Sequence, residues 1–438
     1  MTTSVLWFRR DLRLADHPAL AAAASDGEVV GLFVVDPRLW DRAGSARRAW
    51  VAASVRALQD ATGGALVLRL GDPARVVAEV AAEAGARVVH VTAETTPYGR
   101  ARDARVAATP TGTPYAVAPG AVLTGQGTPY QVFTPFSRAW RAHGWEAPEP
   151  APAVTWRLLP SGPDAVHRLD AALAEGPPGL PAAGEAAAVD RWQAFLDADL
   201  ADYAEARDRP DEDRTSRMSA YLKVGAIHPR RLLADLAGRG GDGVERFVTE
   251  LAWREFYADV AWHRPDRTWT DLRPLAIPYD DPGDGLEAWR AGRTGFPLVD
   301  AGMRQLLHEG WMHNRVRMVT ASFLTKHLHT WWPVGARHFL DHLVDGDLAS
   351  NNHGWQWVAG TGTDAAPYFR VFNPVSQGRR FDPDGDYVRR WVPELAHLPG
   401  AAAHEPWRHP DGYDHGYPAR IVDLDVERRV ALERYEAR

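Results

Sequence analysis

The sequence predicts a Rossmann-like α/β domain with a parallel sheet at the N-terminus, followed by a larger all-α domain. Short apolar runs in the N-terminal part alternate with Ala-rich, helix-compatible stretches, a pattern typical of parallel strands covered by helices. From Val189 onward, helix-length periodic segments are separated by Gly and Pro. The apolar runs are residues 4–8, 29–35, 65–70 and 87–91. The helices expected after Val189 are residues 189–206, 228–238, 243–263, 297–309, 313–328 and 335–344.

A change of composition separates the two halves. Residues 129–184 are rich in Pro, Gly and Ala and show weak periodicity, which is typical of a connection that runs over the surface. We therefore predict an α/β domain at 1–128, an interdomain linker at 129–188 and a helical domain at 189–438.

Composition limits the classes of function. The 438 residues carry a net charge of −7, and 45% hydrophobic with 24% charged residues is ordinary for a soluble globular protein. Zero Cys excludes disulfides, thiolate chemistry and cysteine metal sites. No apolar run reaches membrane-spanning length and the N-terminus lacks signal-peptide architecture, so we expect a cytoplasmic location. The 18 Trp suit a protein that stacks flat partners such as bases or flavins.

Charged residues directly follow the first apolar run. Arg9, Arg10 and Asp11 lie there, and ligands of parallel sheets bind beyond the carboxyl ends of the strands. The two arginines therefore either contact a ligand or pair with acidic neighbours. No GxGxxG motif follows and the chain has no P-loop, so neither a nicotinamide nor a nucleoside triphosphate site is expected here.

A polar and aromatic stripe lines the helix expected at 243–263. The spacing i, i+3, i+4 and i+7 puts Glu250, Trp253, Arg254 and Tyr257 on one face. A Trp beside a carboxylate suits a nucleobase, because the ring stacks on the base and the acid accepts from base N–H groups. We interpret this face as a cleft wall. The other side, which anchors the helix in a core, carries Phe247, Leu251 and Ala258.

Two further segments suit polar partners. TSRMS at 215–219 places three hydroxyls and an Arg at the expected start of a helix, where phosphate can bind, although a helix cap alone would explain one hydroxyl. WMHNRVRM at 311–318 puts an Asn, an Arg and a Met on one side of a helix. Its His313 has no partner at metal spacing, so no metal site is expected. The chain shows no nucleophile–base pair, which disfavours hydrolysis.

The stretch 345–382 contains paired Asn, five Gly and two Pro, too many breakers for a long helix. Its Trp355 and Trp357 are two residues apart, so they cannot share a helix face. We expect these two rings to point at different partners.

Six motifs together resemble the DNA photolyase/cryptochrome family, most closely its class I cyclobutane pyrimidine dimer photolyases. They occur in the family's order over nearly the whole chain and read WFRRDLRLADHPAL, TSRMSAYLKVGAIHPR, ELAWREFY, GFPLVDAGMRQL, GWMHNRVRM and DGDLASNNHGWQWVAGTGTDAAPYFRVFNP. The resemblance implies FAD held in a U-shape by the helical domain and an antenna chromophore against the α/β domain. The implied reaction is repair of dimers in DNA by blue-light-driven electron transfer from excited reduced FAD to a flipped-out dimer.

The same resemblance assigns residues to FAD. Asn351 matches the position that faces flavin N5, where an amide can hydrogen-bond in either protonation state. Arg317 is implied to pair with Asp345, and Phe247 lies where many relatives carry a Trp beside the flavin. The full set implied for FAD is Tyr203, Thr215, Ser216, Arg217, Met218, Ser219, Phe247, Asn314, Arg317, Asp345, Gly346, Asp347 and Asn351.

Other positions are assigned to the dimer and to DNA. Glu250 and Trp253 match the residues that bond and stack the dimer, and other parts of that pocket match Asn314, Met318 and Trp357. DNA backbone contacts are implied for Arg207, Arg315 and Gln377. The positive candidates near the pocket are Arg207, Lys223, Arg315, Arg379 and Arg380. We expect DNA binding to weaken as salt rises.

Photoreduction of FAD in the family usually runs over three Trp. Trp355 and Trp332 match the first two, whereas Tyr279 stands at the third position. Tyr is harder to oxidise than Trp when it has no proton acceptor. We therefore expect the terminal donor to be Tyr279 or, in its place, Trp331 or Trp289. The implied catalytic set is Glu250, Asn351, Trp355, Trp332 and Tyr279.

Alternatives within the family differ at few positions. Enzymes for (6-4) products carry two His in an HxxxH pattern, and Asn314 with Met318 replaces them here, which favours cyclobutane dimers. A blue-light signalling cryptochrome without repair activity is the alternative, and Asn351 and the short segment after Pro393–Leu395 count against it. A flavin reductase would need a nicotinamide site, and no sequence feature supplies one.

The motif TTPYGRARD at 95–103 resembles deazaflavin-binding members, so we expect 8-hydroxy-5-deazaflavin as antenna, with methenyltetrahydrofolate as the alternative. We expect a monomer that binds no membrane.

Overall fold

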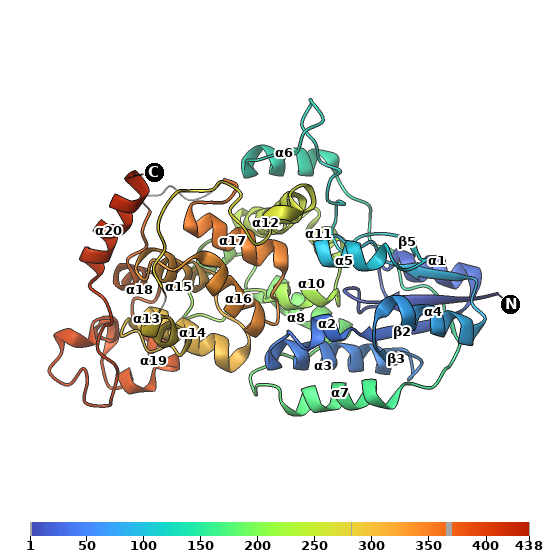
Figure 1. Ribbon diagram of the computed structural model, residues 1–438, viewed down its shortest axis with the longest axis horizontal. Coiled ribbons are helices and arrows are strands. Elements are labelled where there is room, and N and C mark those ends of the chain that lie inside the picture. Colours follow the sequence, from blue (N-terminus) through green and yellow to red (C-terminus); the bar gives the residue numbers. More distant parts are fainter. Residues whose placement is uncertain (1, 282, 365–369, 438) are drawn as a thin grey trace. The chain divides into compact units, whose positions relative to one another are not determined.

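The computed structural model describes residues 2–281, 283–364 and 370–437 (Figure 1). The chain forms two compact units, each built from segments that are not contiguous in sequence. Unit 1 comprises Met1–Ala201, Ser216–Pro265 and Val344–Asp347, and unit 2 comprises Asp202–Thr215, Asp266–Leu343 and Leu348–Arg438. The linear boundaries at residues 128 and 188 stay a prediction.

Unit 1 contains a parallel sheet, which confirms the predicted fold class of the N-terminal region. Each of the four apolar runs forms a strand, and the order β3-β2-β1-β4-β5 is that of a doubly wound sheet whose order reverses between β1 and β4. A short β6 pairs with β2. The strands are β1 (Thr2–Phe8), β2 (Gly27–Val35), β3 (Val67–Leu70), β4 (Val88–Val91), β5 (Thr109–Pro110) and β6 (Thr155–Trp156).

Helices surround this sheet and continue into the later segment of unit 1 (Figure 1). Several of them begin with Pro directly after a residue whose side chain accepts from the first turn, a common helix start. The helices are α1 (Pro18–Asp26), α2 (Pro37–Trp40), α3 (Ser45–Ala61), α4 (Pro73–Ala84), α5 (Pro97–Asp103), α6 (Phe133–His143), α7 (Pro163–Ala174), α8 (Glu185–Ala198), α10 (Met218–Val224), α11 (Pro229–Leu236) and α12 (Asp242–His263).

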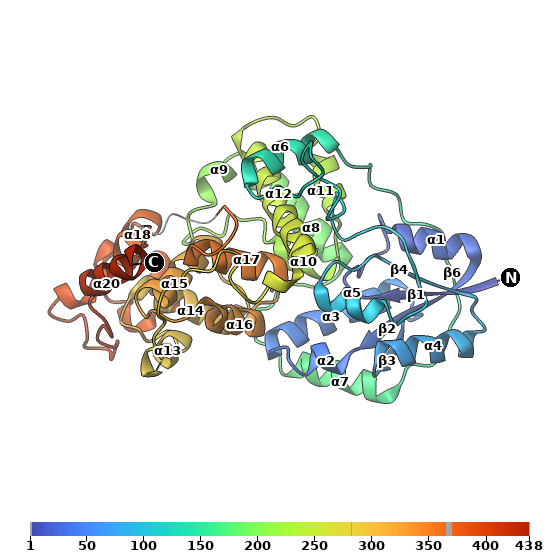
Figure 2. The same cartoon turned by 45° about the horizontal axis from the view of Figure 1, so that its top comes forward.

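The segment 129–188 contains more regular structure than its composition indicates. It holds α6, β6, α7 and the start of α8. Phe133, Phe136 and Trp140 are buried at spacing i, i+3 and i+7, a helical pattern that the surrounding Pro and Gly obscured. Figures 1 and 2 show α6 lying beside the long helix α12.

Unit 2 is helical, as predicted for the second half. Of the expected helices, 297–309 coincides with α14, whereas 335–344 begins three residues earlier. The helices are α9 (Tyr203–Ala206), α13 (Gly283–Arg290), α14 (Pro297–Glu309), α15 (Asn314–Lys326), α16 (Trp332–His342), α17 (Leu348–Ala359), α18 (Pro374–Phe381), α19 (Asp386–Trp391) and α20 (Leu424–Glu436), with short 3-10 helices η1 (Pro265–Arg267), η2 (Pro393–Leu395), η3 (Gly400–His404) and η4 (Pro406–Arg408).

The stretch 345–382 is more helical than its breakers indicate. It forms α17 over twelve residues and α18 over eight, and residues 365–369 of this motif lie outside the described residues. α17 packs against α15 and α16 in a core that includes Trp289, Trp332 and Trp355. Gly335 allows this contact, because a Cβ there would come within 2.2 Å of the Trp355 ring. Within the described ranges, no helix has the length and apolarity needed to cross a membrane.

Candidate functional site

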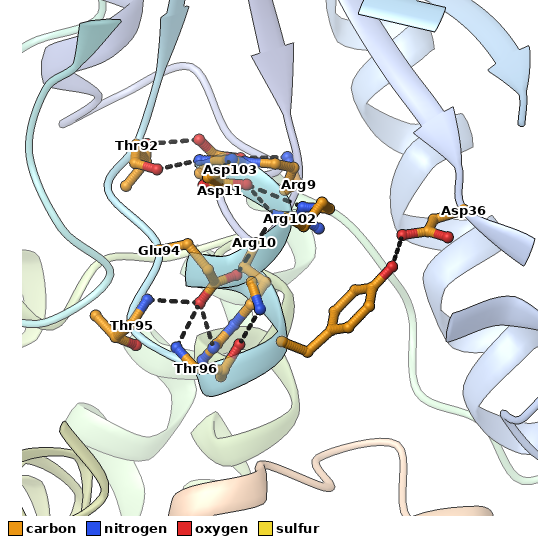
Figure 3. Close-up of polar contacts among 12 residues, drawn as sticks. Arg9, Arg10, Asp11, Asp36, Thr92, Glu94, Thr95, Thr96, Arg102 and Asp103 are labelled. Carbon is orange, nitrogen blue, oxygen red and sulfur yellow. Dashed lines mark hydrogen bonds and ion pairs between the residues drawn. The ribbon is translucent and has the colours of Figure 1, made fainter. Parts of the chain in front are cut away.

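The residues after β1 and β4 form an ion-pair cluster at the edge of the sheet (Figure 3). The Arg9 guanidinium lies 2.6 Å from an Asp103 oxygen and also donates to the Thr92 carbonyl. Asp11 accepts from the Arg9 backbone N–H at 2.6 Å and from the Thr92 hydroxyl at 2.5 Å. Arg9 therefore pairs with an acidic neighbour, which was one of the two interpretations of the arginines after the first apolar run.

Glu94 links this cluster to Arg10. The Arg10 guanidinium lies 3.3 Å from the Glu94 carboxylate, which also accepts from the N–H groups of Thr95 and Thr96 at 2.8 and 3.1 Å (Figure 3). Burial alone would raise the pKa of Glu94, but three neighbouring arginines outweigh burial and lower this pKa to about 2. Glu94 is therefore ionised throughout the physiological range.

The antenna motif at 95–103 contributes to the same edge. Tyr98 donates to Asp36 at 2.6 Å, and burial and this acidic partner raise the pKa of Tyr98 to about 12. Arg102 lies 2.8 Å from Asp103, and Arg100 lies over the Trp262 ring at 3.9 Å. The polar groups of this motif are thus engaged with residues of unit 1.

The segment Val344–Asp347 is surrounded by cations of unit 1. One Asp347 oxygen lies 2.9 Å from the Arg10 guanidinium and 3.6 Å from the Lys223 ammonium. Arg47 donates to the Gly346 carbonyl at 3.2 Å. Lys223, which the sequence indicated as a DNA candidate, is therefore engaged with a carboxylate.

The TSRMS segment leads into α10, as predicted. Arg217 precedes the helix with a positive φ of 54°, and the Ser216 hydroxyl accepts from the Met218 N–H at 3.3 Å. Met218 is buried and Ser219 is exposed, while Thr215 is half-buried in unit 2. The Ser216 hydroxyl thus bonds a backbone N–H at the start of α10, while the N-cap position itself is Arg217.

The α12 stripe has the burial that the sequence predicts. Its members Glu250, Trp253, Arg254 and Tyr257 are half-buried, whereas Phe247 on the other side is buried. The Trp253 ring stacks on Phe133 of α6, with centroids 3.6 Å apart and planes 5° apart. One face of Trp253 is therefore covered within unit 1.

Two buried carboxylates on α12, Glu255 and Asp259, were missed by sequence reasoning. Glu255 is only 3% exposed and accepts from the N–H groups of Ala116 and Val117, at 2.6 and 3.1 Å, and from Trp140 Nε1 at 2.6 Å. Asp259, one turn later, accepts from the Gly120 N–H at 2.7 Å. Burial outweighs these bonds and the nearby Arg254, and it raises the pKa of Glu255 to about 7.

In unit 2, the predicted residues of 311–318 lie at the start of α15. Asn314 is exposed, and His313 caps the helix by accepting from the Arg315 N–H at 3.2 Å. Burial lowers the pKa of His313 to about 4, so its imidazole is neutral at pH 7. Arg315 lies 2.8 Å from Asp208, and Arg317 donates to the Met312 carbonyl at 2.8 Å. In the part of the chain that the structure describes, no cluster of acids and His suits a metal ion.

Side-chain amides fasten α17 to its neighbours in unit 2. Asn351 donates to the Ala336 carbonyl at 3.1 Å. Asn352 donates to the Thr268 carbonyl at 2.6 Å, and Gln356, one turn later, accepts from the Leu272 N–H at 2.9 Å. Asn352 and Gln356 were also missed, although their i, i+4 spacing is visible in the sequence.

The aromatic residues proposed for electron supply differ in exposure. Trp355 and Trp332 are buried, and Trp332 Nε1 donates to Asp271 at 2.7 Å. Trp331 is 38% exposed, and its ring centroid lies 6.5 Å from Trp332 and 6.5 Å from Tyr279. The Tyr279 hydroxyl is buried without a hydrogen-bond partner among the described residues, and burial raises its pKa well above the usual value.

The remaining predicted residues of unit 2 differ in burial and in their partners. Tyr203 is buried in α9, and Met318 and Trp357 pack on the core as partly buried side chains. Arg379 pairs with Glu405. Gln377 Oε1 is buried with no partner in the described ranges. Arg207 is half-buried and Arg380 is exposed.

Comparison with known families decides the relationship. Residues 4–154 match "DNA photolyase", and residues 247–437 match "FAD binding domain of DNA photolyase". This chain belongs to the DNA photolyase family. It is an enzyme of that family and carries the family's FAD-binding domain.

Relatives of this photolyase span its full length. The deoxyribodipyrimidine photo-lyase of Streptomyces griseus is 44% identical over 99% of both chains, and that of Escherichia coli is 39% identical over 100% of this chain and 99% of the relative. Among solved structures, a bacterial class III photolyase from Agrobacterium tumefaciens has a TM-score of 0.91 and 36% identity, covering 100% of this chain and 98% of that one. A Synechocystis cryptochrome has a TM-score of 0.89 and 27% identity over 99% of both chains.

Proposed function

We propose that this photolyase repairs cyclobutane pyrimidine dimers in DNA by light-driven electron transfer from reduced FAD to a flipped-out dimer. The observation that carries this proposal is the 44% identity, over 99% of both chains, to a deoxyribodipyrimidine photo-lyase. The half-buried α12 stripe supports it, because Glu250 and Trp253 remain accessible in part on one face. The class within the family, a monomeric state and a cytoplasmic location are further parts of the proposal.

The chemistry of the described residues suits FAD. Hydroxyls and Arg217 stand at the start of α10, and three cations lie around Gly346 and Asp347. FAD, when bound, supplies the light-excited electron donor. Asn351 is proposed to hydrogen-bond flavin N5, since its amide is held in position by the Ala336 carbonyl. The other proposed contacts are those of Tyr203, Thr215, Ser216, Met218, Ser219, Phe247, Asn314, Arg317 and Asp345.

The proposed dimer site uses the α12 stripe. Glu250 accepts from a base N–H, and Trp253 stacks on the dimer with the ring face opposite Phe133. Asn314, Met318 and Trp357 are proposed to contact the dimer as well. Arg207, Arg315 and Gln377 are proposed to contact the DNA backbone, and Arg315 would exchange its Asp208 partner for phosphate.

The decisive experiment is repair of thymine dimers in an oligonucleotide by purified protein with dithionite-reduced FAD under blue light. We expect repair that is lost in the dark, and Glu250→Gln is expected to slow it, while Glu245→Gln on the exposed side of α12 is the matched control. Absence of repair with reduced FAD bound would leave the signalling cryptochrome as the better proposal.

Electron supply is proposed to run from Trp355 through Trp332 to Trp331. Trp331 is favoured as terminal donor because it is exposed and adjacent to Trp332, whereas Trp289 is fully buried and the Tyr279 hydroxyl has no proton acceptor in the described part of the chain. After oxidation, Trp331 loses its Nε1 proton, and one electron from a soluble thiol together with one proton from solvent restores it. Trp331→Phe should slow photoreduction of oxidised FAD about tenfold or more, an effect of at least about 1.4 kcal/mol. Tyr279→Phe should leave it nearly unchanged, and the opposite ranking would assign the terminal role to Tyr279.

The antenna is proposed to be 8-hydroxy-5-deazaflavin, with methenyltetrahydrofolate as the alternative. Its proposed site is the sheet edge between β1 and β4, where the order of strands reverses. A Sulfolobus tokodaii photolyase structure of 28% identity and TM-score 0.85, covering 100% of both chains, is described as holding two FAD molecules. In the absorbance spectrum of natively purified protein, a peak beyond the folate region would support the deazaflavin, and a peak in the near ultraviolet would support methenyltetrahydrofolate.

A further inference from the structure

The ring of Trp253 on α12 is backed by an aromatic ring from another helix. Phe133, the first residue of α6, lies parallel to it, with centroids 3.6 Å apart and planes 5° apart. Two rings of α12 itself, Phe256 and Tyr257, lie 5.8 and 5.4 Å from the Trp253 ring, at angles of 73° and 41°. Parallel rings at 3.6 Å leave no room for a third ring between them, so a base cannot stack on the face that Phe133 covers.

Contacts along α6 fix the position of Phe133. The Trp140 indole donates from Nε1 to the buried Glu255 carboxylate at 2.6 Å. The Arg141 guanidinium lies 3.1 Å from a Glu245 oxygen, more than two turns away on α12. Figures 1 and 2 show the two helices side by side. These polar contacts lie towards the far end of α6, so the helix keeps its place on α12 through side chains other than those of the ring stack.

The backing restricts the motion of a half-buried indole. A Trp side chain that is free to turn about its torsions loses that freedom when a base stacks on it, and this loss weakens binding. Tilting the Trp253 ring towards α6 would drive it into Phe133, because the two rings are already in contact. The indole is therefore held in one orientation before any base arrives, which lowers the cost of binding.

We propose that Phe133 is a positioning residue of the dimer site, which holds the Trp253 ring in the orientation that stacks on a pyrimidine dimer. Phe133 acts through Trp253 and does not itself touch the dimer. This inference rests on the proposed contact of Trp253 with the dimer. Phe133 takes no part in electron transfer, so its effect falls on the affinity for the dimer and not on the yield of repair from a bound dimer.

The test measures the Kd of FAD-containing protein, in the dark, for an oligonucleotide with one thymine dimer and for the same oligonucleotide without it. We expect Phe133→Leu to weaken binding of the dimer about tenfold, which corresponds to about 1.4 kcal/mol. Its affinity for the undamaged oligonucleotide and its yield of repair per absorbed photon at saturating protein should match the wild type. Phe133→Tyr retains a flat ring and should recover most of the affinity that Phe133→Leu loses.

Phe136→Leu is the matched control for a purely structural effect. Phe136 is buried one turn after Phe133 on the same helix, and both rings pack on Phe256, at 5.1 and 5.9 Å. Phe136→Leu should lower the melting temperature about as much as Phe133→Leu, yet bind the dimer as the wild type does. Equal losses of dimer affinity in the two variants would mean that Phe133 merely holds α6 on α12, and would overturn the inference.

A double variant separates this inference from the proposed function. Because Phe133 acts through the indole, Phe133→Leu should cost no further dimer affinity in a Trp253→Ala background. A further loss there overturns the inference, as does wild-type affinity in Phe133→Leu when Trp253→Ala binds weakly, and both results leave the proposed function standing. Wild-type dimer affinity in Trp253→Ala overturns the proposed dimer site and the inference with it. Phe133→Met replaces Phe133→Leu if that variant does not fold.

Discussion

Two glutamates of unit 1, Glu94 and Glu255, have almost completely buried carboxylates with different surroundings. Three arginines surround Glu94, and the pKa of Glu94 falls to about 2 despite burial. Glu255 accepts from three N–H donors, and burial still raises its pKa to about 7 in spite of these bonds and the nearby Arg254. The dipoles of the N–H groups therefore orient the Glu255 carboxylate but do not offset the cost of its desolvation. The full positive charges of several arginines do offset that cost at Glu94.

The difference indicates two uses of a buried acid. Glu94 holds cations in place and stays charged at all relevant pH values. Glu255 ties the loop at 116–120 and α6 to α12, and it changes its charge near neutral pH. Four experiments test this difference between the two glutamates.

Glu255→Ala should have the largest effect on stability. It leaves two backbone N–H groups and Trp140 Nε1 without their acceptor, and each buried unpaired donor costs about 1–3 kcal/mol. We expect the free energy of unfolding to fall by about 3 kcal/mol in a denaturant titration. Glu245→Ala, on the same helix but exposed and paired with Arg141, should cost at most about 0.5 kcal/mol. Equal losses for the two variants would contradict a special role of the buried carboxylate.

The pH dependence of stability should differ in sign between the two glutamates. Because the pKa of Glu255 is raised from 4.5 to about 7, the folded chain binds this proton more tightly than the unfolded chain. Its contribution is complete below pH 4.5 and is lost as pH rises through 7, a change of about 3 kcal/mol at most. The stability difference between wild type and Glu255→Gln should shrink over this window. A difference that stays constant from pH 4.5 to 7 would show that Glu255 is ionised throughout.

Arg10→Gln should make Glu94 resemble Glu255. The lowered pKa of Glu94 gives stability that is present above pH 4.5 and is lost as pH falls towards 2. Removing one of its arginines raises that pKa, so acid unfolding should begin at higher pH and stability at pH 7 should fall by about 1–2 kcal/mol. Arg10→Lys keeps the charge and should lose less. An unchanged acid transition would mean that Arg9 and Arg102 suffice.

Arg75→Ala should have the smallest effect. Arg75 pairs with Glu79 on α4 at 2.6 Å, and both side chains are more than half exposed. An exposed i, i+4 pair contributes about 0.3–0.5 kcal/mol and is screened by salt. The loss should disappear in 1 M salt, a concentration with a Debye length of about 3 Å. A loss as large as that of Arg10→Gln would mean that burial is not what distinguishes these pairs.

The fold was predictable where the signal was local. The four apolar runs became strands and the periodic segment 297–309 became α14, because hydrophobic periodicity reports burial directly. The two-residue strands β5 and β6 are too short to leave such a pattern. The helices α6 and α7 were hidden among Pro and Gly.

The candidate site was predictable in part for the same reason. The α12 stripe depends on spacing within one helix, so its half-buried face followed from the sequence. The pairs Lys223–Asp347 and Glu255–Ala116 join residues more than a hundred positions apart, and a single sequence carries no sign of such pairs. Arg10 was identified by its place after β1, but its partners were not.

Unit 1 contains residues 344–347 as well as the N-terminal sheet, whereas residues 266–343 belong to unit 2. During synthesis the chain emerges from its N-terminus, so Arg10 and Lys223 are made long before Asp347. Their shared carboxylate arrives only after most of the intervening unit has been translated. A nascent chain shorter than 347 residues therefore carries Arg10 and Lys223 without Asp347. These two side chains can pair with their shared carboxylate only after the last segment of unit 1, residues 344–347, has been made.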